Sequence, residues 1–300
     1  MSKIELTFLG TACMMPTKDR NHQAMFLKYN EHGILLDCGE NTQRQLKIAG
    51  IKPSNISKIL ISHWHGDHVL GLPGLLQSLN ASEYTGKLEI YIPQGDRKYF
   101  DAMTEAFPFD VNIETEIIEF SEPGVIFENK DFKIEAFELS HAIKTFGFNF
   151  VEQDKRKIRM AQVKKLGLES GPLLGQIQRG EDIEFEGRKI AADELSFVVK
   201  GRKISYVADT AEANECEKMV NDADILVCES AFTTEHENKA EEFKHMTAKQ
   251  AGLLASRSNA KKLILTHFSQ RYKTLEPFLK DAKEVFENVE CSYDFMKVKL

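Results

Sequence analysis

The residues with the clearest chemistry occupy six consecutive positions, His63-Trp64-His65-Gly66-Asp67-His68. Three imidazoles packed this closely would repel one another if protonated, and burying them with a carboxylate but without partners would be costly. A divalent metal ion resolves the conflict because neutral imidazoles and carboxylates are its common ligands. An isolated His-x-His is more often an ordinary surface or core feature, but four donors at this spacing favour a metal site.

The elements on either side place this hexapeptide in a strand-to-helix loop. Residues 58–62 form a short apolar run that predicts a strand, and residues 69–79 have the periodicity of an amphipathic helix. In a layered α/β domain such loops lie at the carboxyl edge of the sheet. His63 and His65 can face one ion from an extended segment, whereas Asp67 and His68 begin the next turn and point elsewhere. We therefore expect two metal ions, about 3.5–4 Å apart.

Three further candidate ligands, His141, Asp209 and His267, each come directly after a predicted strand. This context places them at the same sheet edge as the hexapeptide, where they would help to supply the roughly four ligands that zinc prefers. Each alone could be a capping or core residue, and Asp209 could simply cap the helix that follows it. The repeated strand-then-donor arrangement favours metal binding for all three.

Hydrophobic periodicity predicts an α/β protein in which strands and helices alternate in both halves of the chain. We expect strands at residues 4–9, 24–28, 33–37, 58–62 and 88–92, an antiparallel group at 113–120, 125–128 and 132–139, and later strands at 195–199, 203–208, 225–228 and 262–266. Helices are expected at 41–49, 69–79, 97–107, 212–220, 247–257 and 275–286. The pattern indicates a four-layer αββα sandwich in which each half supplies one sheet.

Composition excludes several classes of protein. The N-terminus lacks the apolar stretch of a signal peptide, and the chain lacks the run of about 18 apolar residues that a spanning helix needs. We therefore expect a cytoplasmic protein without a membrane segment. The five cysteines are scattered and form no Cys-x-x-Cys pair, which indicates reduced thiols rather than disulfides or a cysteine zinc site.

The distribution of charge matters more than the net charge of −7, which by itself argues against a nucleic-acid partner. Residues 154–165 carry six Lys and Arg against a single Asp, so this segment is +5 and the rest of the chain is −12. A solvated helix face is the ordinary explanation for such a run. The run begins a polar, glycine-containing stretch that continues to about residue 190, and we interpret this stretch as an excursion from the globular body. A helix is expected within it at 158–166.

The metal-ligand pattern resembles that of the metallo-β-lactamase superfamily. Other segments resemble the ribonuclease Z family of tRNA 3′-processing endonucleases, namely Pro16-Thr17-Lys18-Asp19-Arg20-Asn21, Asp37-Cys38-Gly39-Glu40, Ala208-Asp209-Thr210, His245-Met246-Thr247 and residues 265–272. The resemblance runs nearly from end to end. The hexapeptide specifies only the superfamily, whereas the Pro-x-Lys-x-Arg-Asn loop and the segment around His267 are more selective.

The resemblance implies one metallo-β-lactamase-fold domain over residues 1–300, with a protruding tRNA-binding arm inserted at about 152–190. It implies two Zn²⁺ per subunit, one held by His63, His65 and His141, the other by Asp67, His68 and His267, with Asp209 bridging. A water shared by two such ions has a lowered pKa and yields a hydroxide nucleophile. Asp67 would accept the proton of that water, and His245 would protonate the leaving oxygen.

The implied substrate is precursor tRNA, cut after the discriminator nucleotide to leave a 3′-hydroxyl on the tRNA and a 5′-phosphate on the trailer. The implied RNA-binding residues are Lys18, Arg20 and Asn21 near the metals, and Lys155, Arg156, Lys157, Arg159, Lys164 and Lys165 in the arm. Members of the family pair as homodimers in which the arm of one subunit holds tRNA for the active site of the other. We expect the same here.

Three positions depart from the family pattern, where Ala208 replaces Gly, Cys228 replaces His and Met246 replaces Ser. Cys228 puts any role of the family's His at that position in doubt, and Met246 leaves the hydrogen bonding of His245 open. Two other functions compete with the preferred one. The same centre could hydrolyse a small phosphodiester or ester, or the chain could be a non-catalytic RNA-binding protein with structural zinc.

Overall fold

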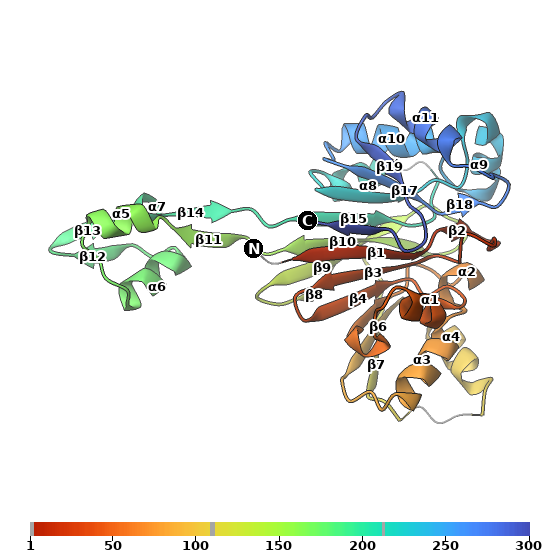
Figure 1. The fold of residues 1–300 in the computed structure, drawn as a ribbon, viewed down its shortest axis with the longest axis horizontal. Coiled ribbons are helices and arrows are strands. Elements are labelled where there is room, and N and C mark those ends of the chain that lie inside the picture. Colours follow the sequence, from red (N-terminus) through yellow and green to blue (C-terminus); the bar gives the residue numbers. More distant parts are fainter. Residues whose placement is uncertain (1–2, 109–111, 212–213) are drawn as a thin grey trace.

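Two seven-stranded sheets pack face to face, and helices cover the outer face of each (Figure 1). The structure is a computed structural model that describes residues 3–108, 112–211 and 214–300. The first sheet has the order β20-β1-β3-β4-β5-β6-β7, with strands β1 (Ile4–Gly10), β3 (Ala24–Tyr29), β4 (His32–Leu36), β5 (Lys58–Leu60), β6 (Leu88–Pro93), β7 (Thr115–Phe120) and β20 (Lys297–Lys299). The predicted four-layer αββα sandwich is confirmed.

The second sheet has the order β19-β17-β16-β15-β10-β9-β8. Its strands are β8 (Gly124–Glu128), β9 (Phe132–Leu139), β10 (Thr145–Glu152), β15 (Lys203–Val207), β16 (Ile225–Glu229), β17 (Leu263–Thr266) and β19 (Val289–Cys291). A short parallel pair, β2 (Ala12–Cys13) with β18 (Phe268–Ser269), joins segments from the two ends of the chain beside the sandwich.

Helices form the outer layers. The first sheet is covered by α1 (Thr42–Ile48), α3 (Leu72–Ala81) and α4 (Arg97–Glu105), and the second by α8 (Asn214–Val220), α10 (Ala248–Arg257) and α11 (Glu276–Lys283) (Figure 1). Shorter elements are α2 (Gly66–Val69), α9 (Glu237–Phe243) and the 3₁₀ turns at Pro53–Asn55 and Thr234–His236. Within the described residues, no helix has the length and apolar content needed to cross a bilayer.

Alternation along the strands assigns side chains to the two sides of each sheet. On β3, Met25, Leu27 and Tyr29 belong to the core between the sheets, whereas Ala24 and Phe26 belong to the core under the helices. This follows from the two-residue period of a strand, because successive side chains point to opposite faces. A strand apolar on both faces is thereby buried on both, as expected in the middle of a layered α/β fold.

Two details of the predicted sheets are wrong. The strand expected at 113–120 is not part of an antiparallel group, because β7 pairs in parallel with β6 in the first sheet. It returns after a helical crossover, α4, which is the connection that parallel neighbours require. The division by halves also fails, because β8 and β9 come from the first half of the chain but belong to the second sheet, and β20 at the C-terminus pairs with β1 in the first sheet. The predicted helix at 212–220 is described only from Asn214 onward, and residues 212–213 lie outside the described residues.

Residues 155–199 form an arm that projects from the body (Figure 1). A two-stranded antiparallel ribbon, β11 (Lys155–Ile158) with β14 (Ser196–Val199), carries at its end α5 (Met160–Lys165), α6 (Pro172–Arg179), α7 (Ala192–Leu195) and the hairpin β12 (Ile183–Phe185) with β13 (Arg188–Ile190). The ribbon closes at Val199, beyond the predicted boundary of 190. Residues 195–199 were predicted as a strand of the body, but Leu195 ends α7 and residues 196–199 are the return leg of the arm.

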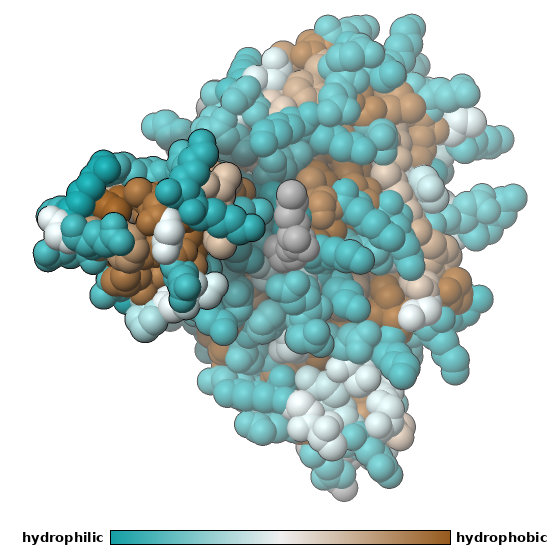
Figure 2. All heavy atoms as spheres, turned by 60° about the vertical axis from the view of Figure 1, so that its left-hand side comes forward, coloured by the Kyte–Doolittle hydropathy of each residue, from teal (hydrophilic) through white to brown (hydrophobic). Residues whose placement is uncertain are grey.

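The arm has a small core of its own, which the hydrophobic pattern of the sequence did not predict. Its buried residues are Val163, Leu168, Ile177, Ile183, Ile190 and Leu195. Figure 2 shows apolar side chains of the arm framed by hydrophilic ones. Because these residues come from short helices and a hairpin, they have no single period along the chain.

A buried carboxylate joins the arm to the body. Glu152, the last residue of β10, accepts hydrogen bonds from the Tyr29 hydroxyl at 3.0 Å, Lys155 Nζ at 3.2 Å and Arg202 Nε at 2.8 Å. Lys155 enters the arm and Arg202 follows its return strand, so one side chain holds both legs against a strand of the body.

Replacing Glu152 with glutamine is expected to destabilise this junction by about 2 kcal/mol, because two cations lose their buried counter-charge. Hydrogen exchange of the β11 and β14 amides should accelerate while exchange in the central strands stays unchanged. The matched control is Asp154→Asn, which breaks only the exposed pair with Lys200 at 2.8 Å and should change stability by less than about 1 kcal/mol. Equal effects of the two variants would contradict this role of Glu152.

Candidate metal centre

The seven predicted ligands converge at one end of the sandwich. His63 and His65 follow β5, Asp67 and His68 lie in α2, His141 follows β9, Asp209 follows β15 and His267 follows β17. Five different segments thus contribute to a site at the ends of neighbouring strands, where loops from both sheets meet.

His63, His65, His141 and Asp209 form the first group of donors that could hold an ion. His65 Nδ1 lies 3.1 Å from His63 Nε2 and 3.3 Å from His141 Nε2, and Asp209 Oδ2 lies 3.7 Å from His63 Nε2. Ligand atoms around a tetrahedral ion with bonds of about 2.0–2.1 Å are about 3.4 Å apart. The spacing of this group matches a metal ion better than it matches hydrogen bonding among imidazoles.

Asp67, His68 and His267 form the second group. Asp67 Oδ2 lies 3.6 Å from His68 Nε2 and 3.4 Å from His267 Nε2. Asp209 reaches this group as well, with Oδ2 at 3.5 Å from His68 Nε2 and Oδ1 at 3.3 Å from His267 Nδ1. One carboxylate therefore touches both groups.

Three buried polar atoms of these groups, His68 Nε2, Asp209 Oδ1 and His267 Nδ1, lack a hydrogen-bond partner within the described residues. Such atoms are costly unless something binds them. Burial raises the pKa of Asp209, but His267 and His68 outweigh it and hold that pKa well below its usual range. Burial also lowers the pKa of His63, with a further contribution from His68, which favours the neutral ring that a metal binds. The donor set therefore fits a divalent metal ion.

Hydrogen bonds behind the donors fix which ring nitrogen faces the centre. The backbone carbonyl of Lys244 accepts from His141 Nδ1 at 2.9 Å, and Ser62 Oγ accepts from His63 Nδ1 at 3.0 Å. Asp37 Oδ2 accepts from His68 Nδ1 at 2.9 Å. In each of these three rings Nδ1 is engaged in a hydrogen bond and Nε2 is left to face the centre, as is common for metal-binding histidines.

Sequence reasoning assigned no role to two carboxylates, Asp37 and Glu229. Asp37 is fully buried and also accepts hydrogen bonds from Ser62 Oγ and the Tyr206 hydroxyl. Asp37 follows β4 and Glu229 ends β16. Glu229 directly follows the strand predicted at 225–228 and so meets the criterion that identified Asp209. Asp37 is the last residue of the strand predicted at 33–37, and only the observed end of β4 at Leu36 places it after a strand.

Glu229 is the partner of His245. Its Oε1 accepts from His245 Nδ1 at 3.0 Å and from the backbone amide of Thr210 at 2.8 Å. Burial lowers the pKa of His245, but Glu229, followed by Asp209 and Asp67, raises it to about 9. Thr247, not His245, caps α10, so the imidazole is not used as a helix cap.

The residues that depart from the family pattern lie behind the centre. Ala208, Cys228 and Met246 are all buried, and they belong to the same hydrophobic core as the residues between the two sheets. Burial raises the pKa of the Cys228 thiol well above its usual range, so this position contributes a neutral core side chain. Met246 points into the core while its neighbour His245 keeps Glu229 as a partner.

Two of the three residues predicted to meet RNA near the centre have partners inside the protein. Arg20 Nη2 donates to the backbone carbonyl of Tyr272 at 2.9 Å, and Asn21 Nδ2 donates to that of Glu40 at 2.8 Å. Both residues thus fix the loop that carries Lys18, whose side chain is exposed.

The cations predicted in the arm also divide into two groups. Lys155 contacts Glu152, Arg156 pairs with Asp193, and Arg159 Nε donates to the Ser196 carbonyl at 3.2 Å. The other three, Lys157, Lys164 and Lys165, are exposed, and within the described residues their side chains have no ion-pair or hydrogen-bond partner.

The helix predicted at 158–166 is shorter than expected and spans Met160–Lys165. Lys155 to Ile158 form strand β11, and α5 carries only Lys164 and Lys165 of the predicted cations. Positive charge is also confined to part of the arm, since residues 154–180 hold seven Lys and Arg against two acidic residues, whereas residues 181–200 hold three against six.

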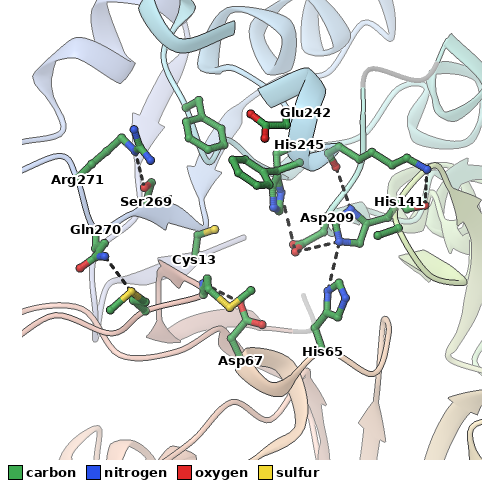
Figure 3. A pocket seen from close by; sticks show the side chains of 16 residues that line it. Cys13, His65, Asp67, His141, Asp209, Glu242, His245, Ser269, Gln270 and Arg271 are labelled. Atoms are coloured by element: carbon green, nitrogen blue, oxygen red, sulfur yellow. Dashed lines mark hydrogen bonds and ion pairs between the residues drawn. The ribbon is translucent and has the colours of Figure 1, made fainter. Parts of the chain in front are cut away.

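A cavity of about 430 Å³ opens onto the donors. Figure 3 shows His65, Asp67, His141, Asp209 and His245 around it, with Ser269, Gln270 and Arg271 on another side. Substrate bound here would meet both donor groups.

Comparison with known proteins places the chain in a family. Residues 175–268 match the model of the beta-lactamase superfamily domain, and residues 4–153 match that of the Anti-Pycsar protein Apyc1. Ribonuclease Z of Chlamydia muridarum is 38% identical, with 99% of each chain covered, and that of Bacillus cereus is 38% identical, with 97% of each covered. The crystal structure of the short form of human tRNase Z matches with a TM-score of 0.72 at 28% identity, covering 98% of each chain. With relatives this similar over the whole length, arm included, the chain belongs to the ribonuclease Z family.

Proposed function

We propose that this protein is an endoribonuclease that removes the 3′ trailer from precursor tRNA. It cuts after the discriminator nucleotide, leaving a 3′-hydroxyl on the tRNA and a 5′-phosphate on the trailer. The observation that carries the proposal is the convergence of two donor groups on one cavity in a chain related over its full length to ribonuclease Z.

Two Zn²⁺ per subunit are proposed to occupy the donor groups, with His63, His65 and His141 holding one, Asp67, His68 and His267 the other, and Asp209 bridging. Bound there, they would neutralise phosphoryl charge and lower the pKa of a water molecule. Asp67, whose Oδ2 already accepts the Met14 amide at 2.8 Å, is proposed to take the proton of the attacking water. His245, held by Glu229, is proposed to protonate the departing 3′-oxygen.

The arm leaves the body from the end opposite the donors. His141 lies in the loop that leads into β10, four residues before its first residue Thr145, and Glu152 at the root of the arm is the last residue of β10. Eight residues of strand span roughly 25 Å. This placement supports a homodimer in which one arm holds tRNA for the other subunit's centre. Mixing Asp209→Ala subunits with subunits that lack the arm should restore cleavage if the arm acts across the dimer.

The direct test is to incubate the purified protein with a 3′-extended precursor tRNA and sequence both product ends. A single cut after the discriminator, with the ends stated above, is the expected result. Binding without cleavage at saturating zinc would instead favour the non-catalytic alternative. A cytoplasmic location, where precursor tRNA would be met, stays a prediction.

A small phosphodiester is the second candidate substrate, because the donor set by itself suits any phosphodiester. Excising the arm at the β11–β14 ribbon separates the two functions. If the preferred function is right, the variant without the arm should lose tRNA cleavage but still hydrolyse bis(p-nitrophenyl) phosphate. A wild-type enzyme that hydrolyses only the small ester would contradict the preferred function.

Neutralising Lys157, Lys164 and Lys165 together is expected to weaken tRNA binding and to flatten its salt dependence. Each lost phosphate contact lowers the slope of log K against log salt by about 0.7–0.9. Filter binding at four salt concentrations measures the slope, which should fall by about 2 if all three contact phosphates.

The control for that experiment is an equal loss of charge on the body. Lys52, Lys130 and Lys280 are exposed lysines outside the arm. Their triple alanine variant should keep the wild-type slope, and equal losses in both triple variants would show that net charge rather than the arm sets the affinity.

A further inference from the structure

Exposed apolar side chains stand beside the charged centre. Met14, Met15 and Phe243 are 63%, 51% and 50% exposed, although Met and Phe are among the residues most often buried. All three line the cavity that contains the donors. Apolar surface that a protein leaves open next to its reactive groups commonly marks a binding site.

The backbone of Met14 is held in place by one of the predicted metal ligands, Asp67. Its amide donates to Asp67 Oδ2 at 2.8 Å, and its φ of 54° lies in the left-handed region, which is unfavourable for a residue with a side chain. Beside it, Gln270 Nε2 contacts Met15 Sδ at 2.9 Å. Two flexible, polarisable side chains therefore lie on the Asp67 side of the cavity.

Phe243 belongs to the segment that fixes two histidines on the other side. It ends α9, and the carbonyl of the next residue, Lys244, accepts from His141 Nδ1. His245 follows directly, and Figure 3 places it across the cavity from Asp67. The Phe243 ring stacks on buried Phe232, with centroids 6.5 Å apart and an interplanar angle of 18°. The Arg271 guanidinium lies 5.3 Å from the centre of the Phe232 ring.

We propose that this cavity is a stacking site for a nucleobase that adjoins the scissile phosphate, with Phe243 on one side and Met14 and Met15 on the other. The inference rests on the proposed function and adds specificity residues to it. A flat ring with apolar faces suits a cavity that is lined by apolar side chains on two sides, and stacking accepts every base because each has a π-face. Arg271, exposed at the rim, is placed to meet the charge of the connecting backbone.

The test pairs a protein change with a substrate change. Phe243→Leu keeps apolar volume against Phe232 but removes the flat face, and precursor tRNAs are made with an abasic residue on either side of the scissile bond. For the base that binds, Phe243→Leu and the abasic change are each expected to lower kcat/KM about tenfold, and together they should lower it no further than either alone. Effects that multiply, or no effect of Phe243→Leu, would overturn the proposal.

A second measurement does not depend on cleavage. 2-Aminopurine placed at the same position should lose fluorescence on binding the wild-type protein and keep it with Phe243→Leu or Met14→Ala. Val125→Ala, which truncates an equally exposed side chain on the edge strand β8, is the control and should behave as wild type. If intact RNA is not cut after the discriminator, the proposed function fails; if both abasic RNAs are cut as fast as intact RNA, only the stacking site fails.

Discussion

Asp209→Ala is expected to abolish cleavage of precursor tRNA while leaving much of the binding intact. Asp209 is 2% exposed and its carboxylate lies within 4.0 Å of five imidazoles, that of His245 and four that come from both donor groups. Without it the two proposed ions lose their shared ligand. Metal ions supply several kcal/mol of transition-state stabilisation, so the cleavage rate should fall by about 10³-fold or more.

Single-turnover cleavage and elemental analysis of the same preparation measure this effect. The variant should carry fewer than two zinc ions per chain, and its affinity for precursor tRNA should stay within a few-fold of wild type because the arm lies at the other end of the body. The control is Asp101→Ala on α4, whose carboxylate pairs only with Arg97 in the described structure. A variant that lost Asp209 but kept its metal and its rate would refute the proposed bridging role.

The donors could be predicted from the sequence because one local rule applies to all of them. His141, Asp209 and His267 each follow an apolar run, and the ends of strands in two packed sheets converge on one edge. A strand and the residue after it are both readable from local pattern, so no long-range pairing had to be known. Asp37 and Glu229 also lie at the ends of strands, but a single carboxylate at such a position also resembles a turn or cap residue.

Features that depend on distant partners could not be predicted in this way. Lys155 to Ile158 form a strand because they pair with residues 196–199, some 40 positions later, whereas the local pattern predicted no strand here and placed Ile158 at the start of a helix. Arg20 looked free for RNA until the fold brought the Tyr272 carbonyl to its guanidinium. Short-range patterns predict which face of a helix or strand a residue occupies. Whether its charge remains available to bind RNA depends on hydrogen bonds to residues far away in the sequence.

Removing the charge of Glu229 is expected to change how cleavage depends on pH. The pKa of His245 is raised to about 9, so at neutral pH the imidazole holds the proton that the departing 3′-oxygen needs. Activity that depends on this acid is present below the pKa and is lost as the pH rises through it. Metal ions bound at Asp209 and Asp67 would neutralise the negative charge of those two carboxylates. Glu229 would then be the carboxylate that keeps the pKa of His245 raised.

Glu229→Gln keeps the shape of the side chain and can still accept from Thr210, but it lacks the negative charge. We expect the descending limb of the pH–rate profile to move to lower pH and the rate at pH 8 to fall by about 10²-fold, the lower range for a lost general acid. His245→Ala should lose the limb altogether. Thermal unfolding of both variants near the wild-type temperature would show that the change is chemical rather than a loss of fold.

A substrate with a better leaving group separates proton donation from positioning. In RNA carrying a 3′-phosphorothiolate at the scissile bond, the departing sulfur needs no proton, so the acid is not required. His245→Ala and Glu229→Gln should cut this RNA at close to the wild-type rate, whereas Asp209→Ala should not. If His245→Ala remained as slow on the sulfur substrate as on normal RNA, His245 would have to act by binding the phosphate, and the Glu229 pair would hold a binding group rather than an acid.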